Sequence, residues 1–223
     1  MKLFLDTADV AAIKELNEIL AVDGVSTNPT IVTRSGKEPE EVFQEIAGVL
    51  LDDQIFFAQV MATDKEGIVA EAKRMLSLKK KNMVIKIPVT KEGLKAIKEC
   101  KKEGIPTLAT AIYSAEQGLM AAKNGATYLA PYVNRMDNYG DGVSQVIDLL
   151  EMLTAYQMDA QIVAASFKNV SQVHRLFKAG IHSVTVPVDV ARNLFEHPAT
   201  TVAVGEFSAH WQKAYQRKSV FKD

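Results

Sequence analysis

The sequence predicts a single (β/α)₈ barrel, in which eight parallel strands alternate with eight helices. Short apolar runs alternate with longer amphipathic stretches eight times along the chain. No Pro-, Gly- or Ser-rich linker divides this alternation. A length of 223 residues with 48% hydrophobic residues is suited to one large α/β domain. We therefore assign residues 1–223 to one domain.

The expected strands are short runs rich in β-branched and other apolar residues. They occupy residues 2–6, 24–27, 54–60, 83–87, 107–111, 128–131, 161–165 and 183–186. Successive side chains of a strand point to opposite faces, so alternate residues of each run are expected to face the barrel axis.

An amphipathic stretch follows each strand and is expected to form a helix. These helices occupy residues 10–20, 40–50, 65–78, 91–103, 115–123, 143–156, 170–178 and 188–195. Gly104, Gly125 and Gly180 follow three of them, where a left-handed cap favours glycine. Ser114 with Gln117 predicts a capping box at the start of another.

Residues 198–223 lie beyond the eighth unit and are expected to form a helical extension. Val202, Phe207, Trp211 and Tyr215 recur there at helical spacing, and Trp211 is the only tryptophan of the chain. Because aromatic residues are enriched at interface cores, we expect this segment to contact another subunit. The alternative is a helix that closes the bottom of its own barrel.

The composition of the chain argues against several functional classes. The chain has 26 basic and 27 acidic residues, a net charge of −1, which gives no general attraction to nucleic acid or anionic membranes. No apolar run approaches the ~18 residues of a membrane span, and the first residues are too short for a signal peptide. With Cys100 as the only cysteine, we expect a cytoplasmic protein.

Lys86 lies inside the apolar run 83–87, which Pro88 ends. Burying an ammonium group costs several kcal/mol unless it is paired or loses its proton. A lysine in such a place commonly acts as a neutral amine that attacks a carbonyl group. The alternative is a lysine on an edge strand that points toward solvent.

Polar residues stand at the carboxyl ends of seven of the eight strands, where barrel enzymes place their active sites. They are Asp6, Asn28, Gln59, Lys86, Thr110, Tyr132 with Asn134 and Arg135, and Ser166. The alternation of side chains predicts that Gln59 and Lys86 both point into the mouth of the barrel. The eighth strand contributes no comparable residue.

Simpler explanations exist for the first members of this set. Asp6 and Thr7 could cap the first helix, and Asn28 before proline is a common turn signal. Gln59 could hydrogen-bond to backbone groups.

The later members also have simpler explanations. Arg135 could pair with Asp137 on the surface, and Ser166 with Lys168 could begin a helix. Residues 79–81, three lysines in a row, are expected to form a solvated loop. The histidines show no metal-ligand spacing, so we predict neither a metal site nor a cofactor; they are His174, His182, His197 and His210.

A desolvated lysine can attack a ketone and form a Schiff base, which serves as an electron sink for carbon–carbon cleavage. Asp6 could act as the base or orient the reactants. Gln59, Thr110 and Tyr132 could hold the water that the reaction sheds and recovers. Arg135, with backbone N–H groups of a helix N-terminus near Ser166, could bind a phosphate.

Several motifs together resemble the short-chain branch of the transaldolase family, which includes the fructose-6-phosphate aldolases. The resemblance covers nearly the whole chain and lies in residues 6–8, 24–29, 83–94, 104–107 and 130–135. It implies a (β/α)₈ barrel with the Schiff-base lysine on the fourth strand, at Lys86. It also implies a homo-oligomer, a pentamer or decamer, whose C-terminal helix reaches over a neighbour.

Two enzymes within this branch fit the motifs. Transaldolases carry glutamate and phenylalanine where this chain has Gln59 and Tyr132, whereas the aldolases carry glutamine and tyrosine. Glutamine cannot ionise, so the proton transfers pass to the tyrosine hydroxyl. The pair Ser26 and Thr27 stands where Thr-Thr is more usual.

The resemblance thus implies a class I aldolase that reversibly cleaves fructose 6-phosphate to dihydroxyacetone and glyceraldehyde 3-phosphate. Its residue roles are Lys86 as nucleophile; Asp6 as orienting acid/base; Gln59, Thr110 and Tyr132 on the water; Asn28 on donor hydroxyls with Thr27 in substrate binding; and Arg135 and Ser166 on phosphate. The alternatives are a transaldolase of the pentose phosphate pathway and a ring that binds a sugar phosphate without catalysis.

Overall fold

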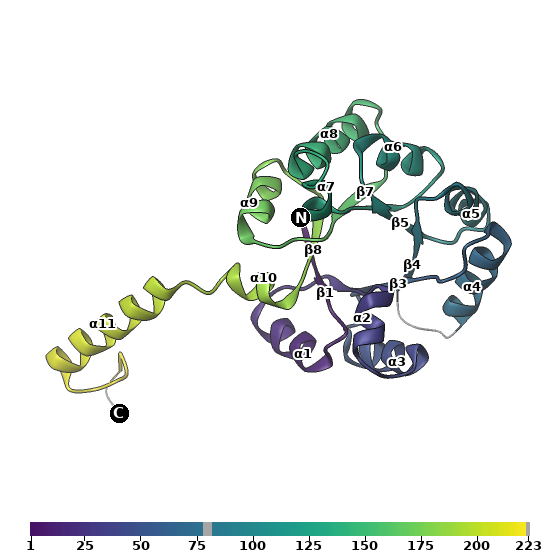
Figure 1. Ribbon diagram of the computed structural model, residues 1–223. Coiled ribbons are helices and arrows are strands. Elements are labelled where there is room, and N and C mark those ends of the chain that lie inside the picture. The colour runs from purple at the N-terminus through teal and green to yellow at the C-terminus, as the bar shows by residue number, and fades with distance from the viewer. Residues whose placement is uncertain (78–81, 222–223) are drawn as a thin grey trace.

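The computed structural model describes residues 1–77 and 82–221 and shows a closed barrel of parallel strands. The strands follow one another around the barrel in sequence order, and the last pairs with the first through residues 2–5 and 183–186. Helices surround the barrel on its outer side (Figure 1). The predicted fold class is confirmed.

All eight predicted strands are present, with ends that differ by no more than one residue from the predicted ones. They are β1 (Lys2–Asp6), β2 (Gly24–Ser26), β3 (Ile55–Gln59), β4 (Met83–Pro88), β5 (Thr107–Ile112), β6 (Tyr128–Pro131), β7 (Gln161–Ala164) and β8 (Ser183–Val186).

The eight predicted helices are present too, together with the C-terminal helix and two short helices that the pattern did not predict. The helices are α1 (Val10–Ile19), α2 (Pro29–Arg34), α3 (Pro39–Val49), α4 (Lys65–Ser77), α5 (Lys91–Lys102), α6 (Ala115–Lys123), α7 (Val133–Met136), α8 (Gly142–Ala155), α9 (Val170–Lys178), α10 (Val188–Asn193) and α11 (Pro198–Tyr215). Leu78, predicted to end the helix at 65–78, and the predicted loop 79–81 lie outside the described residues.

The core has two layers that follow from the alternation of side chains along each strand. The outer layer packs strands against helices and contains most of the buried aliphatic side chains. The inner layer fills the barrel and includes Phe4, Phe57, Val84 and Leu108. The Phe4 and Phe57 rings pack edge to face, 5.0 Å apart. The inner layer thus forms an apolar floor beneath the barrel mouth.

Helix ends match their sequence signals. Gly104, Gly125 and Gly180 have φ angles of +71°, +98° and +78°, a conformation in which glycine carries no steric cost. Ser114 caps α6 by accepting from the Gln117 N–H, but the Gln117 side chain accepts from the N–H of Tyr113. The reciprocal half of the predicted capping box is therefore absent.

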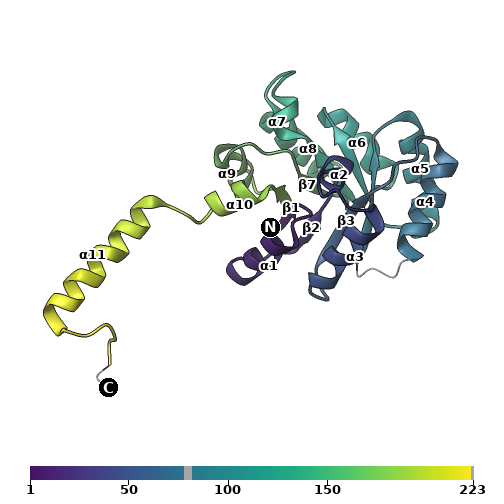
Figure 2. The ribbon, with the colours of Figure 1, turned by 60° about the horizontal axis from the view of Figure 1, so that its bottom comes forward.

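Helix α11 projects away from the barrel (Figures 1 and 2). None of its residues is buried, and the exposed fractions of Phe207 and Val202 are 68% and 61%. The alternative that this segment closes the bottom of its own barrel is therefore wrong. Within residues 1–77 and 82–221, no helix combines the length and the apolarity needed to cross a membrane.

Candidate active site

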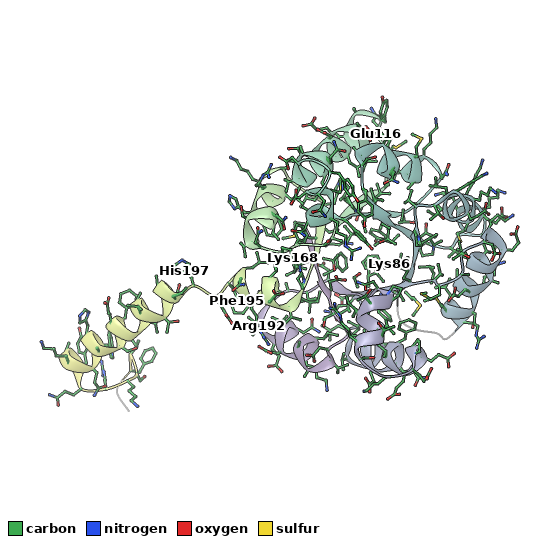
Figure 3. All side chains as sticks on the ribbon, viewed as in Figure 1. Lys86, Glu116, Lys168, Arg192, Phe195 and His197 are labelled. Atoms are coloured by element: carbon green, nitrogen blue, oxygen red, sulfur yellow. The ribbon has the colours of Figure 1, made fainter. Side chains whose placement is uncertain are left out.

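Lys86 lies on β4 inside the barrel (Figure 3), with only 3% of its surface exposed. Its Nζ donates to the hydroxyl of Ser26 at 2.9 Å and to the carbonyl of Thr27 at 2.8 Å. Burial lowers the pKa of Lys86, and the Asp6 carboxylate opposes this shift only in part. The alternative of a solvent-facing lysine is wrong, and the amine is set toward its neutral, nucleophilic form.

Asp6 ends β1 beside Ser26 of β2, since the two residues are register partners. The Ser26 hydroxyl, as a hydrogen-bond donor beside the Asp6 carboxylate, lowers the pKa of Asp6. Burial raises the pKa of Asp6, although Lys86, this hydrogen bond and the Arg135 charge lower it. Asp6 does not cap α1, because Asp9 accepts from the first N–H groups of that helix.

Thr27 and Asn28 follow β2 and bring mainly backbone and amide groups to the site. The Thr27 hydroxyl donates to the carbonyl of Phe57, so its carbonyl, not its side chain, meets Lys86. The Asn28 amide oxygen accepts from the N–H of Ile31 and caps α2. Asn28 thus begins a helix and does not mark a turn alone, and its amide nitrogen has no hydrogen-bond partner among the described residues.

Gln59 ends β3 and is the register partner of Lys86, so both side chains face the barrel interior as predicted. Its amide oxygen is buried and has no hydrogen-bond partner within the described part of the chain. An unpaired buried acceptor costs roughly 1–3 kcal/mol. The expected alternative, in which backbone groups satisfy Gln59, is therefore wrong, and the oxygen is available to a ligand or water.

Thr110 and Tyr132 form the other wall of the barrel mouth. The Thr110 hydroxyl donates to the Tyr132 hydroxyl at 3.1 Å, and Thr110 is completely buried. Strand β5 shifts register against β6 between Ala109 and Ile112, with Ala111 at a φ of +55°. A bulge of this kind re-aims side chains near a site. Burial also raises the pKa of the Tyr132 phenol, which keeps it protonated and able to donate.

Arg135 lies on α7 with its guanidinium 4.9 Å from the centre of the Tyr132 ring. Its Nη1 donates to the Tyr113 hydroxyl at 3.5 Å, a long hydrogen bond. The predicted alternative partner, Asp137, instead accepts from Gly142 and Gln172. Arg135 is exposed and held at the rim by aromatic rings, with its charge available to an anion.

Ser166 follows β7 and lies next to the helix that carries Arg135. Its carbonyl accepts from the N–H of Asn134 at 2.9 Å, and its own φ is +63°. The structure therefore brings Ser166 and α7 together. Helix α9 begins only at Val170, with Asn169 as its cap, so Ser166 does not begin that helix; the helix N-terminus beside Ser166 is that of α7.

Two cavities flank the mouth of the barrel. One, of about 570 Å³, reaches Asn28 and Gln59 and is walled by α2, α3 and α4. The other, of about 580 Å³, lies beside Asp6 and is bordered by Arg34 and Arg192. Both have the size of small-molecule pockets. In the part of the chain that the structure describes, no group of three His, Cys, Asp or Glu side chains is arranged to hold a metal ion.

Together these residues form a cluster of hydrogen-bonding groups above an apolar floor. A lysine with a lowered pKa, a carboxyl with a raised pKa and a protonated phenol converge from different strands. Burial in a low-dielectric interior shifts each group toward its neutral form. The fold and this site define a barrel enzyme that acts on a carbonyl compound through a Schiff-base lysine.

Residues 3–222 match the transaldolase/fructose-6-phosphate aldolase family. The match spans nearly the whole chain, and the chain belongs to this family. The family consists of aldolase- and transaldolase-type enzymes that act through a Schiff base. The resemblance drawn from the sequence motifs is thereby confirmed at the level of the family.

Two residues of the site were not among the predicted ones. Ser26 contacts both Lys86 and Asp6, and Tyr113 contacts Arg135. Ser26 lies between two predicted positions in a motif that was noted, and the alternation of β2 would have placed it inward with the strand ends. Tyr113 follows the irregular end of β5, and no periodicity signals its position.

Proposed function

We propose that this protein is a class I aldolase that reversibly cleaves fructose 6-phosphate to dihydroxyacetone and glyceraldehyde 3-phosphate. Lys86 attacks the ketone and forms the Schiff base. Asp6 takes the proton of the substrate hydroxyl as the carbon–carbon bond breaks. The enamine is then protonated, and water releases dihydroxyacetone from Lys86.

The single observation that carries aldolase over transaldolase is the composition of the barrel wall beside Lys86. Gln59 supplies an uncharged, unpaired amide oxygen, and Tyr132 supplies a hydroxyl bonded to Thr110. The Tyr132 phenol can donate a proton to the water and accept one from it, whereas the Gln59 amide cannot ionise. Proton exchange through Tyr132 favours hydrolysis of the donor adduct over transfer to a second sugar.

The phosphate of the substrate is assigned to the rim that holds Arg135 and Ser166. Arg135 is exposed there, and the Asn134–Ser166 hydrogen bond joins its helix to the end of β7. A guanidinium forms charge-assisted, often bidentate, hydrogen bonds to phosphate. The substrate then extends from Lys86 inside the barrel to Arg135 at its edge, with Asn28 and Thr27 at the donor end.

The proposal is tested by incubating the protein with fructose 6-phosphate in the absence of any acceptor sugar. An aldolase releases glyceraldehyde 3-phosphate and dihydroxyacetone, and both are measured by coupled assays. Erythrose 4-phosphate is then added. Formation of sedoheptulose 7-phosphate faster than release of dihydroxyacetone would establish the alternative, a transaldolase of the pentose phosphate pathway.

The same assay on variants tests whether the wall sets this balance. Gln59→Glu combined with Tyr132→Phe should raise transfer to erythrose 4-phosphate relative to release of dihydroxyacetone. A carboxylate is the stronger base toward the water, and the phenol is gone. A ratio equal to that of the parent in the double variant would show that these two residues do not control the partition.

We also propose that the functional form is a ring-shaped homo-oligomer, a pentamer or a decamer, in which α11 contacts a neighbour. This is supported by the apolar side chains that α11 exposes and by the absence of buried residues in it. Single exposed apolar residues are ordinary, but several on one helix mark an interaction site.

A further inference from the structure

Among the described residues, Ser26 is the side chain that lies between Lys86 and Asp6. Its hydroxyl accepts from the Lys86 Nζ at 2.9 Å, and Ser26 is the register partner of Asp6, whose pKa its hydroxyl lowers as a hydrogen-bond donor. Among the described residues, the partners of Nζ are the Ser26 hydroxyl and the Thr27 carbonyl, and no ion pair joins Lys86 directly to Asp6. The three groups therefore lie next to one another on β4, β2 and β1, with Ser26 bonded to Nζ and placed beside the Asp6 carboxylate.

A hydroxyl group is both a donor and an acceptor, which is the requirement for passing a proton between two such neighbours. The other partner of Nζ, the carbonyl of Thr27, only accepts and cannot hand a proton onward. Ser26 itself is 1% exposed, so bulk solvent does not reach this link. Asp6, in contrast, is partly exposed and borders the open cavity at the mouth.

We propose that Ser26 is a catalytic residue that relays a proton from the Lys86 ammonium to Asp6 before the amine attacks the ketone. One N–H bond of Nζ breaks as its proton moves to the Ser26 oxygen. The original Ser26 proton moves to the Asp6 carboxylate, so serine is regenerated. The products are a neutral amine and a neutral carboxyl group.

Asp6 then releases the proton to solvent through the open cavity. It is thereby ionised when the substrate hydroxyl must lose its proton. This relay rests on the proposed Schiff-base function and specifies how the nucleophile is prepared. The directions in which burial moves the two pKa values, down for Lys86 and up for Asp6, favour this transfer.

The test measures how fast Lys86 forms its Schiff base, separately from later steps. The full-length protein is mixed with dihydroxyacetone in a series of buffers between about pH 6 and pH 9. This range lies above the ordinary pKa values of carboxyl groups and includes that of histidine. Samples are quenched into borohydride at timed intervals, and the reduced adduct on Lys86 is quantified by mass spectrometry. The variants are Ser26→Ala and Ser26→Thr, with the melting temperature of each as a control for folding.

The relay predicts a loss in Ser26→Ala that depends on pH. Near neutral pH the adduct should form about 10²-fold more slowly, a common size for the loss of one proton-transfer group. The loss should shrink as pH rises, because hydroxide can then remove the proton directly. Ser26→Thr keeps the hydroxyl and should restore the parent rate.

Asp6→Asn is a second variant, which leaves Ser26 in place and removes the acceptor at the end of the relay. It should show the same pH-dependent loss, and the double variant Ser26→Ala/Asp6→Asn should be no slower than either single variant. This arm decides the question even if Ser26→Ala folds poorly.

The relay is wrong if Ser26→Ala forms the adduct at the parent rate. A loss that is equal at every pH, or that adds to the loss of Asp6→Asn, also contradicts it and assigns Ser26 a packing role. These outcomes are distinct from failure of the proposed function, in which the parent protein itself forms no adduct on Lys86.

Discussion

Two residues lie in environments that their side chains do not favour. Lys86 is buried inside the barrel, and Phe207 is exposed on α11. The lysine is 3% exposed and surrounded by the strands, whereas the phenylalanine is 68% exposed on a helix with no buried residue. In an ordinary soluble domain charged residues face water, and large apolar residues are buried.

The two regions differ in how the unfavourable free energy of these placements is offset. In the barrel, hydrogen bonds to Ser26 and Thr27 and a lowered pKa reduce the cost of burying the amine. On α11 no part of residues 1–77 and 82–221 buries the apolar side chains. The barrel thus compensates for its buried charge with its own groups, whereas the exposed apolar side chains of α11 are the surface that we propose contacts a neighbouring subunit.

The largest effect is expected from Lys86→Met, which removes the nucleophile and the buried charge together. Activity should be lost, because no other described side chain in the barrel interior can form a Schiff base. The melting temperature should equal or exceed that of the parent, since an apolar side chain of similar length avoids the desolvation cost. Calorimetry and the cleavage assay measure the two effects.

A matched control for this variant is Lys168→Met, an exposed lysine beyond β7. It should leave Schiff-base formation in place. Residual cleavage by Lys86→Met near the parent level would remove Lys86 from the nucleophile role.

Removal of residues 198–223 should change the assembly more than the barrel. The truncated chain keeps both core layers, so its circular dichroism should resemble that of the parent. Its particles should be smaller and its melting temperature lower, because the neighbouring surface loses its cover. Light scattering or sedimentation measures the particle mass.

Phe207→Glu tests the same surface without truncation, since it places a charge on the exposed apolar side of α11. Lys213→Ala, on the same helix, is the control and should assemble as the parent does. A truncated protein with its full assembly mass would show that α11 contributes nothing to assembly.

Arg135→Ala should weaken the binding of phosphorylated substrates about tenfold to a hundredfold, seen chiefly as a higher KM. A charge-assisted hydrogen bond contributes roughly 1.5–3 kcal/mol, and the phosphate is held alike in the ground and transition states. Kinetics of the reverse reaction with glyceraldehyde 3-phosphate and with glyceraldehyde give the comparison. Arg74→Ala, in the cavity walled by α2, α3 and α4, is the control. Equal losses with both aldehydes would place Arg135 outside the phosphate site.

The smallest effect concerns His182, which is half-buried just before β8 and accepts from the Ile162 N–H through its Nδ1. Burial lowers its pKa below the ordinary value of 6.5. As the pH falls below about 6.5, His182 is protonated in the unfolded chain before it is protonated in the folded protein. The free energy of unfolding should therefore decrease as the pH drops below this value, and the His182 contribution should stay constant at higher pH. His182→Asn should reduce this slope in denaturant unfolding, whereas a variant of the exposed His174 should not. If the free energy of unfolding of His182→Asn depends on pH as that of the parent does, groups other than His182 cause the loss of stability in acid.

Most of the fold could be predicted from the sequence because period-two and helical patterns are local. The two missed helices are short and depend on their surroundings. Helix α2 has six residues and follows Asn28 and Pro29, a pair that signals a turn as readily as a helix start. Helix α7 has four residues and no side-chain cap.

The site could be predicted as a set of strand ends, but not its internal contacts. Lys86 and Gln59 face the interior because alternation fixes the faces of their strands. The link from Lys86 to Ser26 joins two strands that are separated by β3 and by 60 residues of sequence, so no local pattern predicts it. The contact of Tyr113 with Arg135 depends on the register shift in β5, which no local pattern encodes.

The most direct test of the central claim is borohydride trapping with fructose 6-phosphate in the parent protein. We expect one reduced adduct, located on Lys86 by peptide mass spectrometry, and its absence in Lys86→Met. Release of glyceraldehyde 3-phosphate without an acceptor sugar should accompany it. The absence of an adduct, or its location on a different lysine, would contradict the assignment of Lys86 as the Schiff-base residue of this barrel.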